Sequence, residues 1–134
     1  MVRAIMHGCN GHMGQVITGL IKADEGIELV AGIDKYTGIA NDYPVFESLE
    51  KCDVEADVII DFSNAAAADA LLTYCEEKKM PVVLCTTGLS EEQLAKIPEA
   101  AKKTAVLKSA NMSLGINLLM KLLKEATKVL APAG

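Results

Sequence analysis

Short runs of apolar residues alternate along the chain with longer stretches in which apolar residues recur at helical spacing. The short runs predict strands and the periodic stretches predict helices. The expected strands are Arg3–His7, Glu28–Ile33, Val58–Asp61, Val82–Cys85 and Ala105–Lys108, with a short edge strand at 43–46 where Pro44 is tolerated. The expected helices are Gly11–Ala23, Ala65–Lys78, Glu91–Lys102 and Leu114–Leu130, with a weaker one over Glu47–Cys52.

The order and polarity of these elements predict an open, doubly wound α/β sheet. Strict alternation of strands and helices implies mostly parallel pairing with right-handed crossovers. The run "VVLC" is apolar on both sides, as expected for a strand buried between two layers of helices. The apolar face of the first helix consists of Met13, Val16, Ile17, Leu20 and Ile21, and the opposite face of Gln15, Thr18 and Lys22. Ser90 with Gln93 predicts a capping box, and Ser63 or Asn64 can cap the helix at Ala65.

Composition narrows the class of protein. The 134 residues suit one domain, and with 51% hydrophobic residues the chain can bury a substantial core. The net charge of -5 argues against a nucleic-acid partner, and no run reaches the roughly 18 apolar residues of a membrane span. The start does not resemble a signal peptide, and Cys9, Cys52, Cys75 and Cys85 form no C-x-x-C pair. We therefore expect reduced thiols, no metal site and a cytoplasmic location.

The segment "MHGCNGHMG" carries glycines at regular intervals between the first strand and the first helix. Gly8 permits a sharp turn, Gly11 lets a pyrophosphate approach the backbone, and Gly14 lets the helix pack closely on its strand. Free amides at the helix start then hold the anion. The spacing is G-x-x-G-x-x-G, a variant of the commoner dinucleotide motif, and a purely structural turn is the alternative.

An acidic residue follows the second strand. Asp34 lies twenty residues after Gly14, where a carboxylate can accept both hydroxyls of an adenosine ribose and favour NAD. Lys35 could instead neutralise a 2′-phosphate and favour NADP. An acid beside a base fits a protein that accepts either NADH or NADPH. The alternative is that Asp34 only starts a turn.

Three further strand ends carry small or hydroxyl residues, in "IIDFSNA", "VLCTTGLS" and "VLKSANMSLG". Ligands of open α/β sheets bind beyond the carboxyl ends of the strands, so these loops are candidate contacts for a ribose or nicotinamide. Ordinary turn chemistry explains any single loop equally well. His7 and His12 flank the glycine loop, and we expect structural or phosphate-proximal roles for them and no catalytic one.

The motifs "GCNGHMG", "IIDFS", "CTTGLSEEQ" and "SANMSLGINLLMKLL" occur in the order typical of one family. The chain resembles 4-hydroxy-tetrahydrodipicolinate reductase, also called dihydrodipicolinate reductase. The resemblance implies a Rossmann-like fold, with helices on both faces of a mostly parallel sheet. It also implies an NADH- or NADPH-dependent oxidoreductase that reduces a cyclic imine precursor of diaminopimelate and lysine.

Carried over by motif, the resemblance implies a set of cofactor contacts. Gly8, Cys9, Asn10, Gly11, His12 and Met13 would wrap the pyrophosphate, and Asp34 and Lys35 would meet the adenosine ribose. Cys85, Thr86 and Thr87 would lie near the nicotinamide ribose, and Ser109, Ala110, Asn111 and Met112 would border the nicotinamide. Thr87 would also touch the substrate. The family often has glycine where this chain has Cys85, so a contact there is expected through the backbone.

The family also has a paired-histidine segment, with a lysine three residues on, that supplies the proton donor and binds substrate carboxylates. The chain ends at "KVLAPAG", before that point. We therefore expect residues 1–130 to form the dinucleotide-binding domain and 131–134 to begin a connection to a substrate and tetramerisation domain. The chain would hold no catalytic residue and would bind cofactor with little turnover.

Two interpretations of the chain end stay open. It is either a truncated reductase or a stand-alone module that senses NAD(H) without catalysis. The expected helix Leu114–Leu130 is apolar over a wide arc, which predicts an exposed apolar patch or self-association of the 134-residue chain.

Overall fold

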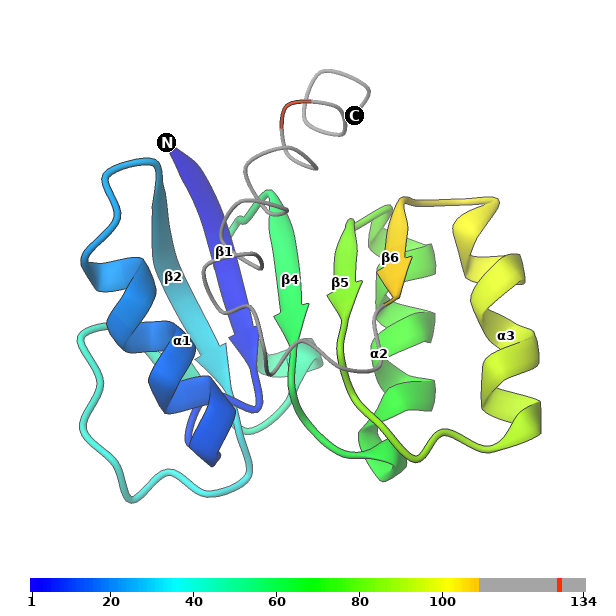
Figure 1. The fold of residues 1–134 in the computed structure, drawn as a ribbon, viewed down its shortest axis with the longest axis horizontal. Helices are drawn as coiled ribbons and strands as arrows, with labels where there is room; N and C mark the ends of the chain where they lie inside the picture. The colour runs from blue at the N-terminus through cyan, green and yellow to red at the C-terminus, as the bar shows by residue number, and fades with distance from the viewer. Residues whose placement is uncertain (109–127, 129–134) are drawn as a thin grey trace.

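The computed structural model describes residues 1–108 and residue 128 (Figure 1). Its centre is a six-stranded sheet in which every neighbouring pair is parallel. The strands are β1 (Val2–His7), β2 (Ile27–Ile33), β3 (Val45–Phe46), β4 (Val58–Asp61), β5 (Val82–Leu84) and β6 (Val106–Lys108), in the order β3-β2-β1-β4-β5-β6. The five longer expected strands differ from these bounds by at most one residue, and the expected edge strand is confirmed as β3.

Helices cover both faces of the sheet (Figure 1). The helices are α1 (His12–Lys22), α2 (Ala65–Lys78) and α3 (Glu91–Ala101). Successive residues of a strand point to opposite faces. Ala4 and Met6 of β1 accordingly share one core with Ile17 of α1, whereas Ile5 shares the other core with Leu71 of α2. The predicted doubly wound, Rossmann-like architecture is confirmed.

The strand order reverses at the centre of the sheet. From β1 the chain continues through β2 to β3 on one side, and then returns to β4, β5 and β6 on the other. Such a reversal leaves a crevice outside the carboxyl ends of the two central strands. His7 and Asp61 are the last residues of β1 and β4, and they are register partners.

The helix caps agree with the sequence and resolve one alternative. Ser90 Oγ accepts a hydrogen bond from the Gln93 amide at 3.1 Å, and Gln93 Oε1 accepts one from the Ser90 amide at 2.9 Å. This is the predicted capping box at α3. At α2 the cap is Asn64, whose side-chain oxygen accepts an amide of the first turn at 3.2 Å. Ser63 instead donates its hydroxyl to Asp61 at 2.6 Å.

Two local predictions are wrong. The weak helix expected over Glu47–Cys52 is a single 3₁₀ turn, η1 (Leu49–Lys51), because one short turn cannot offset the cost of starting a longer helix. Thr18, expected on the polar face of α1, is half-buried. Its hydroxyl donates to the Gly14 carbonyl at 2.8 Å and lies 3.0 Å from the Tyr43 hydroxyl.

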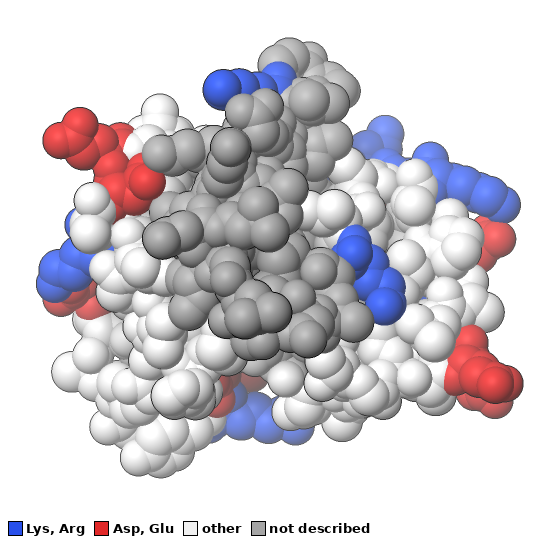
Figure 2. All heavy atoms as spheres, in the orientation of Figure 1, with Lys and Arg blue, Asp and Glu red and all other residues white. Residues whose placement is uncertain are grey.

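The expected helix Leu114–Leu130 lies outside the described residues, apart from Lys128, which is helical and exposed. The predicted apolar patch lies outside them as well. In the part of the chain that the structure describes, no helix is long and apolar enough to cross a membrane. On the face in Figure 2, the basic and acidic side chains of the described residues are scattered and do not gather into one basic patch.

The end of α2 offers a stability test. Lys79 adopts a left-handed conformation with φ 52° and ψ 41°, which an L side chain occupies at a cost of about 1 kcal/mol relative to glycine. We expect Lys79→Gly to raise the free energy of unfolding, measured by urea denaturation, by about 0.5–1 kcal/mol. Lys78→Gly, inside the helix, should lower it by about 1 kcal/mol. Destabilisation by both changes would contradict the assignment of strain to Lys79.

Candidate functional site

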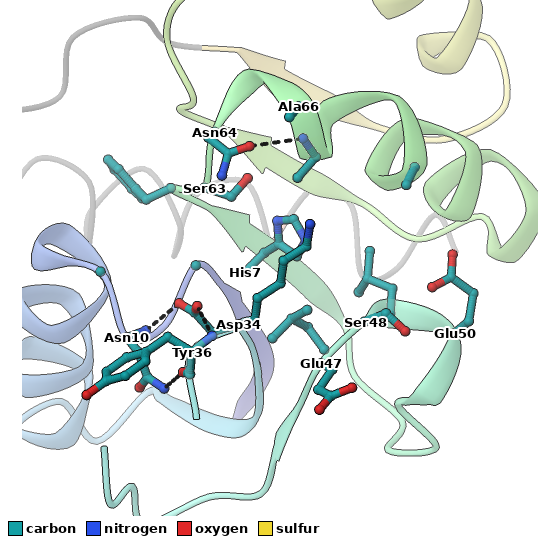
Figure 3. Close-up of a pocket in the computed structure, with 18 residues that line it drawn as sticks. His7, Asn10, Asp34, Tyr36, Glu47, Ser48, Glu50, Ser63, Asn64 and Ala66 are labelled. Atoms are coloured by element: carbon teal, nitrogen blue, oxygen red, sulfur yellow. Dashed lines mark hydrogen bonds between the residues drawn. The ribbon is translucent and has the colours of Figure 1, made fainter. Parts of the chain in front are cut away.

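A cavity of about 500 Å³ opens at the carboxyl ends of the central strands. Its walls come from the loop after β1, the turn after β2, the 47–50 segment and the start of α2 (Figure 3). The residues that matter for its chemistry are His7, Gly8, Asn10, Gly11, Asp34, Lys35, Glu47, Glu50 and Ser63. The cavity lies at the crevice where open α/β sheets bind ligands, and its size suits a small molecule.

The three glycines of the loop after β1 serve different purposes. Gly8 has φ +83°, and a β-carbon there would lie 2.5 Å from the Phe62 carbonyl oxygen. A β-carbon at Gly14 would collide with the Gly8 carbonyl oxygen and lie 2.7 Å from that of Cys9. Both glycines are therefore required by packing. A β-carbon at Gly11 would meet only the Gly8 oxygen, at 3.5 Å, so nothing in the packing of the described residues requires glycine there.

The start of α1 has the features of an anion site. Gly11 is the N-cap and supplies no side-chain hydrogen bond, and the first turn contains no acidic residue. Among the described residues no hydrogen bond engages the amides of His12 or Met13. The amides of Asn10 and Gly11 are already used, by Asp34 Oδ2 at 3.0 Å and by the Gly8 carbonyl at 3.2 Å. An anion would thus meet the amides of the first helical turn and the positive end of the helix dipole.

Asp34 links the turn after β2 to the loop after β1. Its Oδ2 accepts the Asn10 amide at 3.0 Å, and its Oδ1 accepts the Tyr36 amide at 2.9 Å (Figure 3). Each carboxylate oxygen can accept a second hydrogen bond, so the half-buried carboxylate keeps capacity for a ligand at the edge of the cavity. Asp34 does start a turn, as the alternative interpretation predicted, because it accepts the Tyr36 amide. The same side chain could still bind a ligand, so the turn does not exclude a binding role.

Asn10 has a bracing role that the sequence did not reveal. Its side chain is buried, donates to the Tyr36 carbonyl at 2.5 Å and accepts from Asn41 Nδ2 at 2.8 Å. Its own carbonyl accepts from Gln15 Nε2 at 3.0 Å. These bonds fix the 34–41 segment against the loop after β1. Partners 26 and 31 residues away in the chain carry no local signal, so only the fold reveals the role.

The charged lining of the cavity is mixed. Lys35 is exposed and lines it beside Asp34, while Glu47 and Glu50 approach from the segment around η1. Lys51 holds Glu47 in an exposed ion pair at 2.8 Å, which lowers the pKa of that carboxyl. Among these lining residues Lys35 is the cation placed next to the expected ribose position.

Several predicted contacts do not line the cavity. The Cys9 thiol is buried in the core, where burial, with Asp34 nearby, raises its pKa to about 11. Met13 packs against the same core, and His12 is exposed at the helix start. The side chains of Cys9 and Met13 are therefore turned away from a ligand, and the Cys9 amide already donates to the Ile33 carbonyl at 3.4 Å.

The loop after β5 also lies away from the cavity lining. Cys85 is buried, and burial followed by the charge of Asp61 raises its pKa to about 12. Thr86 is buried and its hydroxyl donates to Asp61 Oδ2 at 2.6 Å, so that hydroxyl is used inside the protein. Thr87 is exposed. The predicted nicotinamide contacts Ser109, Ala110, Asn111 and Met112 lie outside the described residues.

A buried carboxylate joins the ends of β1, β4 and the loop after β5. Asp61 is fully buried and accepts hydrogen bonds from Ser63 Oγ at 2.6 Å, the Ser63 amide at 3.2 Å and Thr86 Oγ1 at 2.6 Å. Its Oδ1 also lies 2.7 Å from His7 Nδ1. The sequence signal for this cluster was an acidic residue that ends an apolar strand, but its partners required the strand order.

The thiols give a test of this core. All four cysteines are free. Partial burial also raises the pKa of half-buried Cys52, whereas fuller burial raises the pKa of Cys75 and Cys85 to about 12. The thiolate is the reactive form. We expect a thiol reagent at pH 8 to modify one cysteine in the native protein and four after unfolding. Cys52→Ser should abolish the native reaction; rapid modification of more than one native thiol would contradict the burial.

Comparison with known proteins decides the family. The family model described as "Dihydrodipicolinate reductase, N-terminus" matches residues 2–112. The chain belongs to the dihydrodipicolinate reductase family. It is 48% identical over 130 residues to 4-hydroxy-tetrahydrodipicolinate reductase of Clostridium novyi and 51% identical over 130 residues to that of Caldanaerobacter subterraneus. The family predicted from the sequence motifs is confirmed.

These alignments cover 97% of this chain but only 52% and 51% of the two relatives. The chain therefore spans about half the length of the curated dihydrodipicolinate reductases it matches. The matched family model describes their amino-terminal part.

Solved structures agree with the fold. A dipicolinate-bound dihydrodipicolinate reductase from Paenisporosarcina sp. TG-14 superimposes with a TM-score of 0.75 at 26% identity, covering 95% of this chain and 54% of that one. The WlbA dehydrogenase from Bordetella pertussis, in complex with NADH and UDP-GlcNAcA, gives a TM-score of 0.69 at 18% identity and covers 95% of this chain and 39% of that one. The second likeness shows a shared fold alone.

Proposed function

We propose that this chain is the dinucleotide-binding part of a 4-hydroxy-tetrahydrodipicolinate reductase and that it holds NADH or NADPH at the cavity beside α1. The observation that carries the proposal is Gly11. It caps α1 without a side chain, and packing among the described residues leaves space where a β-carbon would stand. At Gly11 a ligand can come close to the backbone, because glycine has no side chain to stand in the way. This position is also the start of a helix at the point where the strand order reverses, which is where a diphosphate typically binds.

Different residues of the chain would bind different parts of the cofactor. The loop Gly8 to Met13 presents the first-turn amides of α1 to the diphosphate. Asp34, fixed by two backbone amides, accepts the ribose hydroxyls of NADH. Exposed Lys35 can pair with a 2′-phosphate, which is why we propose that the chain accepts both cofactors.

The bound nicotinamide supplies the hydride that reduces the cyclic imine in diaminopimelate and lysine biosynthesis. We place Cys85, Thr86, Thr87 and 109–112 near the nicotinamide, with Thr87 also near substrate. Because Thr86 directs its hydroxyl to Asp61, its contact would be through the backbone.

We infer that the 134-residue chain binds cofactor with little turnover. We expect neither histidine to be the proton donor to substrate, because the diphosphate would occupy the space beside both: His7 lines the cavity at the end of β1, and His12 lies at the start of α1. A cytoplasmic location and a tetramer formed through the remainder of the enzyme complete the proposal. In longer relatives that remainder accounts for about half the length.

Fluorescence titration with NADH tests the proposal. We expect saturable binding below millimolar cofactor, and no oxidation of NADH by the 134-residue chain when the imine substrate is added. The same chain fused to the carboxyl-terminal half of a longer family member should oxidise NADH with that substrate. No binding at millimolar NADH would overturn the proposal, and binding by a reading frame that ends naturally at Gly134 would favour an NAD(H)-sensing module.

A further inference from the structure

His7 is a side chain at the cavity that is absent from the predicted cofactor contacts, and for which the sequence predicts only a structural or phosphate-proximal role. Its side chain is 9% exposed, and it belongs to the residues that line the cavity, beside Gly8 and Ser63 (Figure 3). It ends β1, directly before the glycine loop. The question is which of its two ring nitrogens is available to a ligand.

The hydrogen bond to the buried carboxylate of Asp61 determines the protonation of Nδ1. A carboxylate has about four acceptor positions, and three of the four partners of Asp61 can only be donors toward it: the Ser63 amide, the Ser63 hydroxyl and the Thr86 hydroxyl. The fourth partner is His7 Nδ1 at 2.7 Å. The cluster therefore assigns a proton to Nδ1, donated to Asp61, and leaves Nε2 as the ring nitrogen without a hydrogen-bond partner among the described residues.

Nε2 faces the cavity. The His7 side chain makes its hydrogen bond within the described residues through Nδ1. No buried side-chain nitrogen or oxygen of those residues lacks a partner, so Nε2 must retain open surface. Since the exposed part of His7 lines the cavity, that surface points toward the space beside the glycine loop.

We propose that His7 is a further cofactor-positioning residue, whose Nε2–H donates a hydrogen bond to the diphosphate of the dinucleotide while Asp61 fixes the ring. This inference rests on the proposed function. Diphosphate oxygens only accept hydrogen bonds, so the bound state carries protons on both ring nitrogens; the second proton comes from solvent, and no covalent bond changes. Within the described ranges, the other charged groups that line the cavity are Asp34, Lys35, Glu47 and Glu50.

The chain has two histidines, which makes a direct test practical. In protein labelled with ¹⁵N-histidine, addition of ADP-ribose should move the His7 Nε2 signal to the position of a protonated nitrogen in a hydrogen bond. The spectrum of His12→Asn assigns the signals. A His7 Nε2 signal that stays unchanged, or remains that of an unprotonated nitrogen, in the saturated complex would overturn the inference.

A variant supplies the second readout. His7→Asn replaces Nδ1–H with an amide that can still donate to Asp61, but it removes Nε2. We expect its affinity for ADP-ribose to fall about tenfold or more, as for loss of a charge-assisted hydrogen bond. Ser63→Ala, which removes another donor to Asp61 and keeps Nε2, should retain the protonated Nε2 signal.

The outcomes distinguish failure of cofactor binding from failure of the role assigned to His7. If the wild-type chain binds neither NADH nor ADP-ribose, the proposed function fails and this inference fails with it. If the wild type binds and His7→Asn binds equally well, only the role of His7 is overturned. Should His7→Asn not fold, the wild-type ¹⁵N spectrum alone decides.

Discussion

Gly14→Ala is expected to lower the free energy of unfolding by about 3 kcal/mol, a large share of the roughly 5–15 kcal/mol that stabilises a typical domain. The new β-carbon would collide with the Gly8 carbonyl and approach the Cys9 carbonyl at 2.7 Å. Both are backbone atoms, so relief requires α1 to move away from β1. Alanine gains about 1 kcal/mol in helix propensity, which the clash exceeds. Urea unfolding followed by circular dichroism measures the change.

Gly11→Ala is the matched control, in the same loop and with the same added atom. Its β-carbon would lie 3.5 Å from the Gly8 carbonyl, an ordinary contact, and its φ of -74° suits alanine. We expect the free energy of unfolding to change by less than about 1 kcal/mol, the usual cost at an N-cap. NADH affinity should nevertheless fall at least tenfold, because the methyl group occupies the approach of the diphosphate. A stable Gly11→Ala protein that binds NADH like wild type would refute the proposal that the diphosphate approaches the backbone at Gly11.

Asp34→Ala carries the second large effect. The substitution removes the carboxylate that we place on the ribose hydroxyls, and hydrogen bonds to a charged group contribute about 1.5–3 kcal/mol. The NADH dissociation constant should therefore rise about 10- to 100-fold. The effect on NADPH should be much smaller, because its 2′-phosphate no longer meets a negative charge beside Lys35. Fluorescence titration with both cofactors measures the ratio.

Two further variants test whether the loss of NADH affinity comes from the ribose contact of Asp34 or from its bonds within the loop. Asp34→Asn keeps one oxygen that can accept the Asn10 amide but loses the acceptor for the Tyr36 amide, so it should retain part of the bracing while still losing NADH affinity. Lys35→Ala should weaken NADPH more than NADH. Parallel losses of both cofactors in Asp34→Ala and Asp34→Asn would mean that Asp34 only braces the loop through the Asn10 and Tyr36 amides.

The layout of the sheet was predictable from local chemistry. Apolar runs such as Val58–Asp61 are buried from both sides, and strand-helix alternation permits few topologies other than parallel winding. The roles of Gly8 and Gly14 were also predictable, because a sharp turn and a close helix contact both follow from the absence of a β-carbon. The same rule leaves Gly11 free for a ligand.

The polar clusters of the site were not predictable in the same way. His7 and Asp61 are 54 residues apart, and their contact depends on β4 pairing directly with β1. Asn10 braces Tyr36 and Asn41 across a loop whose path has no periodic signal. Motif reasoning marked Cys9 and Cys85 as contacts. Both thiols are buried in the core, so a contact at either residue would be through the backbone, as the sequence already predicted for Cys85.

Cofactor binding by this chain depends on contact between the first turn of α1 and the diphosphate of a dinucleotide at the switch point of the sheet. A crystal structure of the chain with NADH would show this contact. We expect diphosphate oxygens on the amides of His12 or Met13, beside Gly11, with the adenosine ribose on Asp34. A dinucleotide bound elsewhere, or a diphosphate that makes no contact with this helix start in a fully occupied complex, would contradict it.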